Sequence, residues 1–509
     1  MLNLQYFNMI KQLTLFAFFL VSFCLQAQKN WDAQIDTNLR GVLQKHKELV
    51  SIPNLPVNKE NMLKNVAWVT REFKALNFQV RALESPTLPV LFAEKVYQKN
   101  LKTILFYFHL DGQSVNPKMW DQQDPFVPEL KAQDNEGNWQ IIDWSHLNET
   151  INDDWRIFAR AAADDKAPII MFLAALEILQ QQDKEPTFNI KVVIDLEEEY
   201  GSEGFLSTLT ANKNVYASDY FIIMDGPAHS SNKPTLTYGC RGIATCTITT
   251  YGSKLPQHSG HYGNYVSNPV FTLSHLLASM KSESGKVLIQ DYYKGIVITP
   301  EIKTLLDNVP DNKNEINESL GIHTSEKVGA NYQESLQYPS LNVRQIETSW
   351  KGDTPKTIIP ELAMANIDVR LVVETDGALQ LKKIKKHIEG QGFLVLDRDP
   401  TDEERLNNEK IVKFTANKGV NAFRTATDSK FGSQLKEAMK ETFGEAPVII
   451  RTMGGTVPII PAIKVLDIPA IIVPMVNMDN NQHNPNENIR IGNIRQGIKI
   501  CLAIFNMKL

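Results

Sequence analysis

Four short apolar runs in this chain each lead into a residue type that can bind a metal ion. The runs are residues 104–108, 190–194, 220–224 and 470–473, and they are followed in turn by His109, Glu197–Glu199, Asp225 and His483. Runs of this length that are rich in β-branched and aromatic residues predict strands buried in a parallel sheet. In open α/β sheets, ligands bind in the crevice beyond the carboxyl ends of the strands. We therefore predict that these four strand ends share one metal site.

The remaining pattern predicts an α/β protein with a smaller α+β domain inserted into it. Strand-like runs alternate with helical patterns up to about residue 230, and the same alternation returns near residue 430. Between them, longer strand-like stretches predominate. The long polar segment 112–157 predicts loops over the sheet edge. The individual predictions are helices at 32–50, 60–76, 169–180, 269–281, 377–390 and 432–443, and inserted strands at 242–251, 341–349, 357–371 and 392–397.

The charge balance and the N-terminus restrict the possible partners and the location. A net charge of −5 without a basic tract argues against nucleic acid and anionic membranes as partners. Residues 13–25 are apolar and follow Lys11, which is typical of a signal peptide and too short for a membrane span of about 20 residues. We expect residues 1–28 to be removed, starting from Met1 or Met9, and the protein to be exported (periplasmic or secreted). Lipidation of Cys24 is the alternative, although the bulky Phe23 precedes it.

The other cysteines and the acidic clusters could have structural roles rather than a role in a zinc or manganese site. Cys240, Cys246 and Cys501 have spacings that match neither a disulfide framework nor a zinc knuckle, so we expect buried thiols. Carboxylate clusters often lie on solvated surfaces or bind calcium. Two histidines among the carboxylates favour zinc or manganese over calcium, whose ligands are oxygens.

Sequence blocks around these positions resemble the M20 metallopeptidases, and within them the carnosinase-like and cytosolic-nonspecific-dipeptidase-like enzymes. The blocks follow the family's order and span nearly all of the mature chain. They are His109–Asp111, Trp120 with Pro125 and Phe126, Arg160–Lys166, Glu198–Gly204, Asp225–Gly226, Tyr238–Gly242, His258–Gly260, Arg370–Val372, Gly454–Pro458 and His483–Glu487.

This resemblance implies a zinc-peptidase-like catalytic domain that binds two divalent metal ions, with zinc as the first choice and manganese as the alternative. Asp164 would bridge the ions, His109 and Asp225 would complete one site, and Glu199 and His483 the other. Such a pair activates a bridging water and polarises a carbonyl group. Glu198 would be the general base that passes a proton to the leaving amine. Asp111 would hold His109 in its tautomer and orientation.

The resemblance also assigns roles to the inserted domain. Residues 241–425 would form a lid and dimerisation domain between two catalytic parts, residues 29–240 and 426–509, so we expect a homodimer. His258 would stabilise the oxyanion in the neighbouring subunit's site. Thr357 and Arg370 would hold the free carboxylate of the substrate, with Thr456 from the second catalytic part as a further contact.

At some positions the alignment with the family must be chosen, and at others this sequence departs from the family pattern. Two adjacent glutamates precede one residue and then Gly-Ser in the family, so Tyr200–Ser202 identifies the pair as Glu198 and Glu199 and leaves Glu197 structural. Ala159, Ala161 and Ala167 replace common glycines, which restricts the local backbone. The resemblance further implies a cis peptide bond after Asp164.

The sequence therefore predicts an exported metallopeptidase for dipeptides or short peptides with a free C-terminal carboxylate. An N-acyl amino acid amidohydrolase of the same fold is the alternative, because the acyl pocket is not identifiable. A scaffold without activity is disfavoured, because all proposed ligands and the base are present.

Overall fold

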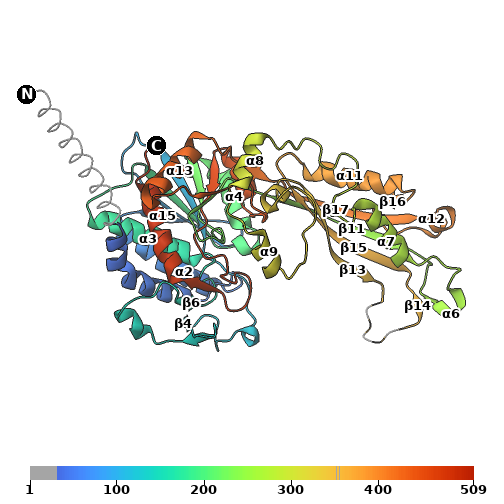
Figure 1. Ribbon diagram of the computed structural model, residues 1–509, viewed down its shortest axis with the longest axis horizontal. Coiled ribbons are helices and arrows are strands. Elements are labelled where there is room, and N and C mark those ends of the chain that lie inside the picture. The colour runs from blue at the N-terminus through green and yellow to red at the C-terminus, as the bar shows by residue number, and fades with distance from the viewer. Residues whose placement is uncertain (1–30, 351, 353, 355) are drawn as a thin grey trace, which may run out of the picture. The chain divides into compact units, whose positions relative to one another are not determined.

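The computed structural model describes residues 31–509 apart from 351, 353 and 355, and divides into two compact units (Figure 1). The first unit comprises residues 31–236 with Ala426–Val448 and Ala462–Leu509, and the second comprises Thr237–Thr425 with Ile449–Pro461. The predicted signal peptide and Cys24 lie outside the described residues. No helix in the described part of the chain combines the length and the apolar character needed to cross a bilayer.

The boundary in the C-terminal part differs from the expected one. We expected all of residues 426–509 in the first unit, but residues 449–461 join the second. The amide of Tyr238 donates to the carbonyl of Ile450 over 2.8 Å, and the amide of Arg241 donates to the carbonyl of Met453 over 3.1 Å. These backbone hydrogen bonds connect segments that are far apart in sequence, which a periodicity analysis does not detect.

The first unit is built on an eight-stranded mixed sheet, which confirms the predicted α/β class. The four predicted strands are neighbours in the order β7-β3-β8-β20, and each neighbouring pair is parallel. Their carboxyl ends therefore meet at one edge. The full order is β1 (Gln79–Leu83), β2 (Val90–Lys95), β7 (Asn189–Asp195), β3 (Thr103–His109), β8 (Tyr220–Ile223), β20 (Ala470–Ile472), β9 (Thr235–Thr237) and β19 (Val448–Ile450).

Helices cover this sheet and seal its core. Helix α3 (Lys166–Gln181) is buried along almost its whole length, because it is apolar on nearly all sides, and it packs against α15 (Ile491–Phe505). The Phe172 ring lies 4.9 Å from that of Phe106 in β3 and 5.1 Å from that of Phe505 in α15. Further helices are residues 31–50, α2 (Lys59–Ala75), α4 (Glu203–Ala211), α5 (Lys213–Tyr216), α13 (Lys430–Phe443) and α14 (Ile460–Leu466).

The segment predicted to be only loops also contains strands. It contributes to a four-stranded sheet in the order β21 (Asn488–Arg490), β6 (Arg156–Phe158), β4 (Glu129–Gln133) and β5 (Trp139–Ile141), and it contains the short helices η1 (Pro117–Met119) and η2 (Trp144–Asn148). The loop prediction is therefore wrong in part. These strands are too short and too polar to give a clear apolar period, and β21 pairs with them from the far end of the chain.

The second unit is a separate α+β structure. Its five-stranded sheet has the order β13 (Ser340–Thr348), β15 (Leu362–Leu371), β11 (Gly242–Tyr251), β17 (Ile411–Val420) and β16 (Leu394–Leu396). Helices α7 (Pro269–Met280) and α11 (Gly377–Gly390) cover it with a core that includes Ile248, Leu276 and Ile384. Smaller elements are β10 (Gly239–Cys240), β18 (Phe423–Arg424), β12 (Gln257–His258), β14 (Ile358–Ile359), α6 (Ser259–Tyr262), α8 (Pro300–Asp307), α9 (Lys313–Ser319), α10 (Tyr332–Ser335) and α12 (Asp402–Asn407).

Candidate metal centre

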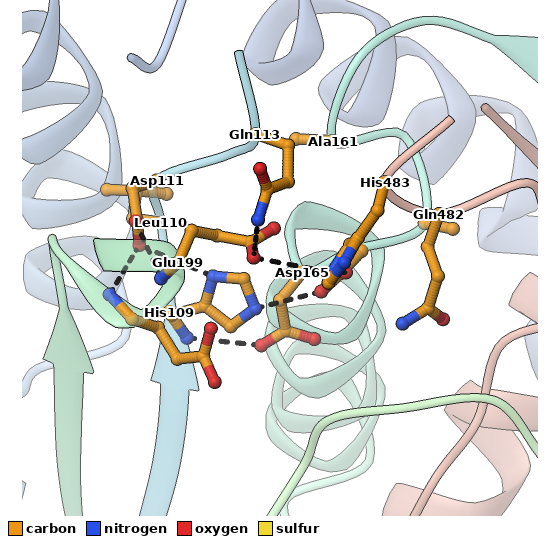
Figure 2. Close-up of polar contacts among 12 residues, drawn as sticks. His109, Leu110, Asp111, Gln113, Ala161, Asp165, Glu199, Gln482 and His483 are labelled. Atoms are coloured by element: carbon orange, nitrogen blue, oxygen red, sulfur yellow. Dashed lines mark hydrogen bonds and ion pairs between the residues drawn. The ribbon is translucent and has the colours of Figure 1, made fainter. Parts of the chain in front are cut away.

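The residues predicted as metal ligands converge at the carboxyl edge of the parallel strands. His109 is the last residue of β3, Asp225 follows β8, and Glu199 lies in the short helix η3 (Glu198–Tyr200) after β7. Asp164 lies in the turn before α3, and His483 lies in the loop after β20. Figure 2 shows His109, Glu199 and His483 directed toward a common centre.

Asp164 contacts residues on both sides of this centre. Its Oδ1 lies 2.9 Å from His109 Nε2, and its Oδ2 lies 3.2 Å from His483 Nε2. His483 Nε2 is also 3.3 Å from Glu199 Oε2. Two sets of potential ligand atoms result, each within 4.8 Å: one from His109, Asp164 and Asp225, the other from Asp164, Glu199 and His483. The arrangement can hold two cations that share one carboxylate.

Asp111 is fully buried and organises three of its neighbours. Its Oδ1 lies 3.4 Å from His109 Nδ1, which leaves His109 Nε2 directed at Asp164. Its two carboxylate oxygens also accept the backbone amides of Glu198, over 3.0 Å, and Glu199, over 3.1 Å. Asp111 therefore orients the imidazole and fixes the turn that carries Glu198 and Glu199.

A second buried carboxylate, Glu487, holds the turn that presents Asp164. It accepts the amide of Ala161 over 2.9 Å and those of Ala163 and Asp164 over 3.0 Å each, and it pairs with Arg160 Nη1 over 2.7 Å. These bonds stabilise a turn in which Ala161 has a φ of 59°, a left-handed value that a Cβ atom disfavours. The peptide bond after Asp164 is cis, as the resemblance implied.

The pKa values reflect crowded, buried carboxylates. Burial, followed by the charge of Asp164, raises the pKa of Asp225 to about 6 and that of Glu199 to about 7. Burial alone would lower the pKa of His109, but Asp111 and Asp164 hold it well above its ordinary value. Burial is also the main cause that raises the pKa of Glu198.

This donor set fits divalent cations. Buried carboxylates that repel one another at this distance need positive charge nearby, and imidazole with carboxylate ligands suits zinc and manganese. Glu198 belongs to neither ligand set, although its carboxyl group senses the charges of His109, Asp225 and Asp164. Its carboxyl group is therefore close enough to interact electrostatically with members of both ligand sets without belonging to either.

The predicted substrate-binding residues lie in the second unit, where they form two pairs. In one pair, His258 in β12 lies next to Thr357, whose carbonyl accepts the amide of Ser259 over 3.0 Å. In the other pair, Arg370 Nη1 donates to Thr456 Oγ1 over 2.8 Å. His258 is exposed, and its Nδ1 accepts the amide of Gly260 over 3.0 Å, which leaves Nε2 available to a ligand.

Several supporting residues were not identified from the sequence. Gln113 Nε2 donates to Glu199 Oε2 over 2.7 Å, and the Asp165 carboxylate accepts the amide of His109 over 3.2 Å (Figure 2). Glu487 and Arg160 stand inside recognised blocks but had no assigned role. Gln113, four residues after His109, carried no such signal. Glu197 accepts the hydroxyl of Thr87, which agrees with the structural role expected for it.

Comparisons with known proteins agree with this architecture. The model of peptidase family M20/M25/M40 matches residues 105–506. The Cys-Gly metallodipeptidase of Schizosaccharomyces pombe is 24% identical over 89% of this chain and 92% of its own. The Beta-Ala-His dipeptidase of Homo sapiens is 26% identical over 82% of this chain and 77% of its own. The crystal structure of human carnosine dipeptidase 1 superimposes with a TM-score of 0.71 at 22% identity, covering 94% of this chain and 98% of that one.

Proposed function

Because the chain belongs to peptidase family M20/M25/M40, we propose that it is a di-metal hydrolase of dipeptides or short peptides with a free C-terminal carboxylate. The observation that carries this proposal is the pair of ligand sets that share Asp164, with Glu198 beside them. The similarity to two dipeptidases along most of the chain supports a short peptide as the substrate.

In this proposal, some residues of the site would bind the cations and another would transfer a proton. His109, Asp164 and Asp225 would hold one ion, and Asp164, Glu199 and His483 the other. Two bound divalent ions supply Lewis acidity that lowers the pKa of a water molecule and polarises a carbonyl group. Glu198 accepts the proton of the attacking water and delivers it to the nitrogen of the leaving amine. The raised pKa of Glu198 suits a group that must both take up and release a proton.

The substrate carboxylate would bind in the second unit. The Arg370 guanidinium is partly exposed and supported by Thr456, and a planar fork of donors matches the two oxygens of a carboxylate. Thr357 and His258 lie beyond the opposite end of β15 from Arg370, so they would reach this substrate from the neighbouring subunit, with His258 Nε2 donating to the oxyanion. The resemblance implies that His258 stabilises the oxyanion in the neighbouring subunit's site, so we also propose a homodimer. Light scattering of the purified protein tests this oligomeric state.

The decisive experiment measures hydrolysis of a mixed dipeptide pool by protein that starts at residue 29, with mass spectrometry as the readout. Samples with chelator, zinc and manganese are compared. Metal-dependent loss of particular dipeptides is expected, and zinc is our first choice. If dipeptides survive but N-acetyl amino acids are cleaved, the amidohydrolase alternative replaces the proposal. If metal-loaded protein cleaves neither class, the chain is a binding scaffold and the proposal is wrong.

Export is a separate proposal that rests on the apolar N-terminal run. N-terminal sequencing of protein recovered outside the cytoplasm tests it. A new N-terminus near residue 29 supports signal-peptide cleavage, whereas an acylated Cys24 supports a lipid anchor. An unprocessed N-terminus in the cytoplasm contradicts both.

A further inference from the structure

The second unit contains a pocket that the proposed catalytic roles do not use. Its volume is about 490 Å³, which lies in the range of small-molecule sites. Helices α9 and α10, β13 and the segments between them form its wall, and the wall carries aliphatic and tyrosine side chains. Its members include Val287, Tyr293, Ile316, Tyr332, Leu336 and Arg241.

The ionised side chains of this pocket give it an excess of positive charge. Four cationic residues, Arg241, Lys281, Lys313 and Lys327, face two acidic ones, Asp311 and Glu326. Both acidic residues already have partners, because Glu326 pairs with Lys281 over 2.7 Å and Asp311 accepts Gln333 Nε2 over 2.8 Å. With Lys281 and Glu326 paired, Arg241, Lys313 and Lys327 remain against Asp311 alone, so a ligand of this pocket meets an excess of positive charge.

Arg241 is a cation of this pocket with an unsatisfied hydrogen-bond donor. Its Nη1 donates to a neutral group, the carbonyl of Tyr338, over 3.3 Å. Its Nε is buried and has no hydrogen-bond partner among the residues that the structure describes. A buried donor without a partner costs free energy, so an anionic acceptor at this position is favoured. Burial, and next the charge of Arg370, lower the pKa of Arg241 to about 10.

The backbone links Arg241 directly to the proposed carboxylate site. Thr456 Oγ1 accepts from Arg370 and donates to the carbonyl of Arg241 over 2.6 Å. Ser340, which lines the pocket, lies opposite Arg370 in the pairing of β13 with β15. The pocket therefore begins next to the guanidinium that we propose for the C-terminal carboxylate.

We propose that this pocket binds the side chain of the substrate's C-terminal residue and selects aspartate or glutamate there. The two guanidinium groups would each take one carboxylate, Arg370 the α-carboxylate and Arg241 the side-chain carboxylate. The volume admits larger side chains as well, so charge rather than size is the selective property. This inference rests on the proposed function, because it assigns the second carboxylate of the same substrate.

The test compares an acidic substrate with its neutral isostere. For metal-loaded wild-type protein, we expect kcat/KM to be at least about tenfold higher for Ala-Glu than for Ala-Gln, since hydrogen bonds to charged groups are worth that much. Arg241→Gln should bring the ratio close to one, whereas Arg241→Lys, which keeps the charge but not the fork, should retain part of it. Lys386→Gln makes the same charge change at an exposed position of α11, outside the pocket, and should leave the wild-type ratio unchanged.

Binding of free L-glutamate and L-glutamine, measured by calorimetry, separates this inference from the proposed function. If glutamate binds more tightly than glutamine and Arg241→Gln abolishes this difference, the inference about the pocket is supported. If neither dipeptide is cleaved in that case, only the proposed function fails. Equal rates and equal affinities for the acidic and neutral compounds overturn the inference, as does a preference that Arg241→Gln leaves intact. Near-UV circular dichroism of each variant establishes that the fold is retained.

Discussion

At the scale of single residues, the most influential side chain outside the ligand sets is Asp111. Its carboxylate lies beside His109 and accepts the amides of Glu198 and Glu199, so one residue positions a proposed ligand, the proposed base and a second proposed ligand. The family resemblance implied only the first of these contacts. The other two depend on β3 lying next to β7, which are separated by about eighty residues of sequence and adjacent only in the fold.

The assignment of Glu198 as the general base can be tested with the neighbouring Glu197 as a matched control. Glu198→Gln should retain both metal ions and lose about 10²–10⁴-fold in kcat, the usual contribution of a positioned proton-transfer group. Glu197→Gln, the same change on the preceding acid, should retain activity because Glu197 bonds to Thr87 and Leu88 instead. Steady-state kinetics and metal analysis by mass spectrometry measure both quantities.

The opposite result would identify an error of register. An inactive Glu197→Gln protein beside an active Glu198→Gln protein would mean that the base is the preceding glutamate. Loss of metal from Glu198→Gln would instead make Glu198 a ligand, in conflict with its place outside both ligand sets.

At the scale of elements, strongly apolar segments could be predicted and weakly patterned ones could not. The four parallel strands and helices α7 and α11 lie where the sequence places them, because burial on both faces or on one regular face leaves a clear period. Strand β17 was missed, since only its first residues are apolar and buried and most of the others are exposed without an apolar alternation. The predicted strand 357–371 is divided into β14 and β15 at Pro360, whose missing N–H cannot continue the ladder.

The buried pair of Arg160 and Glu487 predicts a large effect on the turn before α3. Glu487→Ala leaves the Arg160 charge buried and frees three amides, so the free energy of unfolding should fall by about 3–5 kcal/mol. Asp479→Ala removes an exposed partner of Arg156 and should cost no more than about 1 kcal/mol. Urea titration of each variant measures these changes, and similar costs for both would contradict the structural role of Glu487.

The packing of helix 31–50 on the same turn predicts a pH dependence of stability. His46 Nε2 lies 2.8 Å from the carbonyl of Ala162, and burial lowers the pKa of His46 from 6.5 to about 4. The unfolded chain therefore binds a proton at a higher pH than the folded chain. The contribution of His46 is complete above pH 6.5 and is lost as the pH falls toward 4, by about 3 kcal/mol.

The control for this effect is His46→Gln, which can still donate to the Ala162 carbonyl but does not titrate. Chelator-treated wild-type and variant proteins are unfolded in urea between pH 7.5 and pH 4. The difference between their unfolding free energies should change across this window, because His46 titrates only in the wild-type protein. Protonation of the carboxylates affects both proteins alike and therefore cancels from this difference. A constant difference would mean that His46 is accessible to protons in the folded state.

At the scale of the whole molecule, the candidate metal site belongs to one unit and the candidate carboxylate site to the other. Each unit has its own buried core, around the eight-stranded sheet in the first and the five-stranded sheet in the second. The family resemblance, which the family model confirms, was needed to assign roles to His258 and Arg370. Neither residue stands in a local pattern that distinguishes a binding residue from a surface one.

This division predicts where metal binding should stabilise the protein. Cations that bind only the folded first unit stabilise it by about 2.7 kcal/mol when their free concentration is one hundred times Kd. Hydrogen exchange with and without zinc should show added protection in β3, η3 and the turn before α3. The core strands β11 and β15, which contribute no proposed ligand, should exchange alike in both samples. Asp225→Asn should weaken this zinc-dependent protection, because it removes the charge of one proposed ligand. If zinc instead protected both units of that variant equally, zinc would bind at a site other than the proposed one.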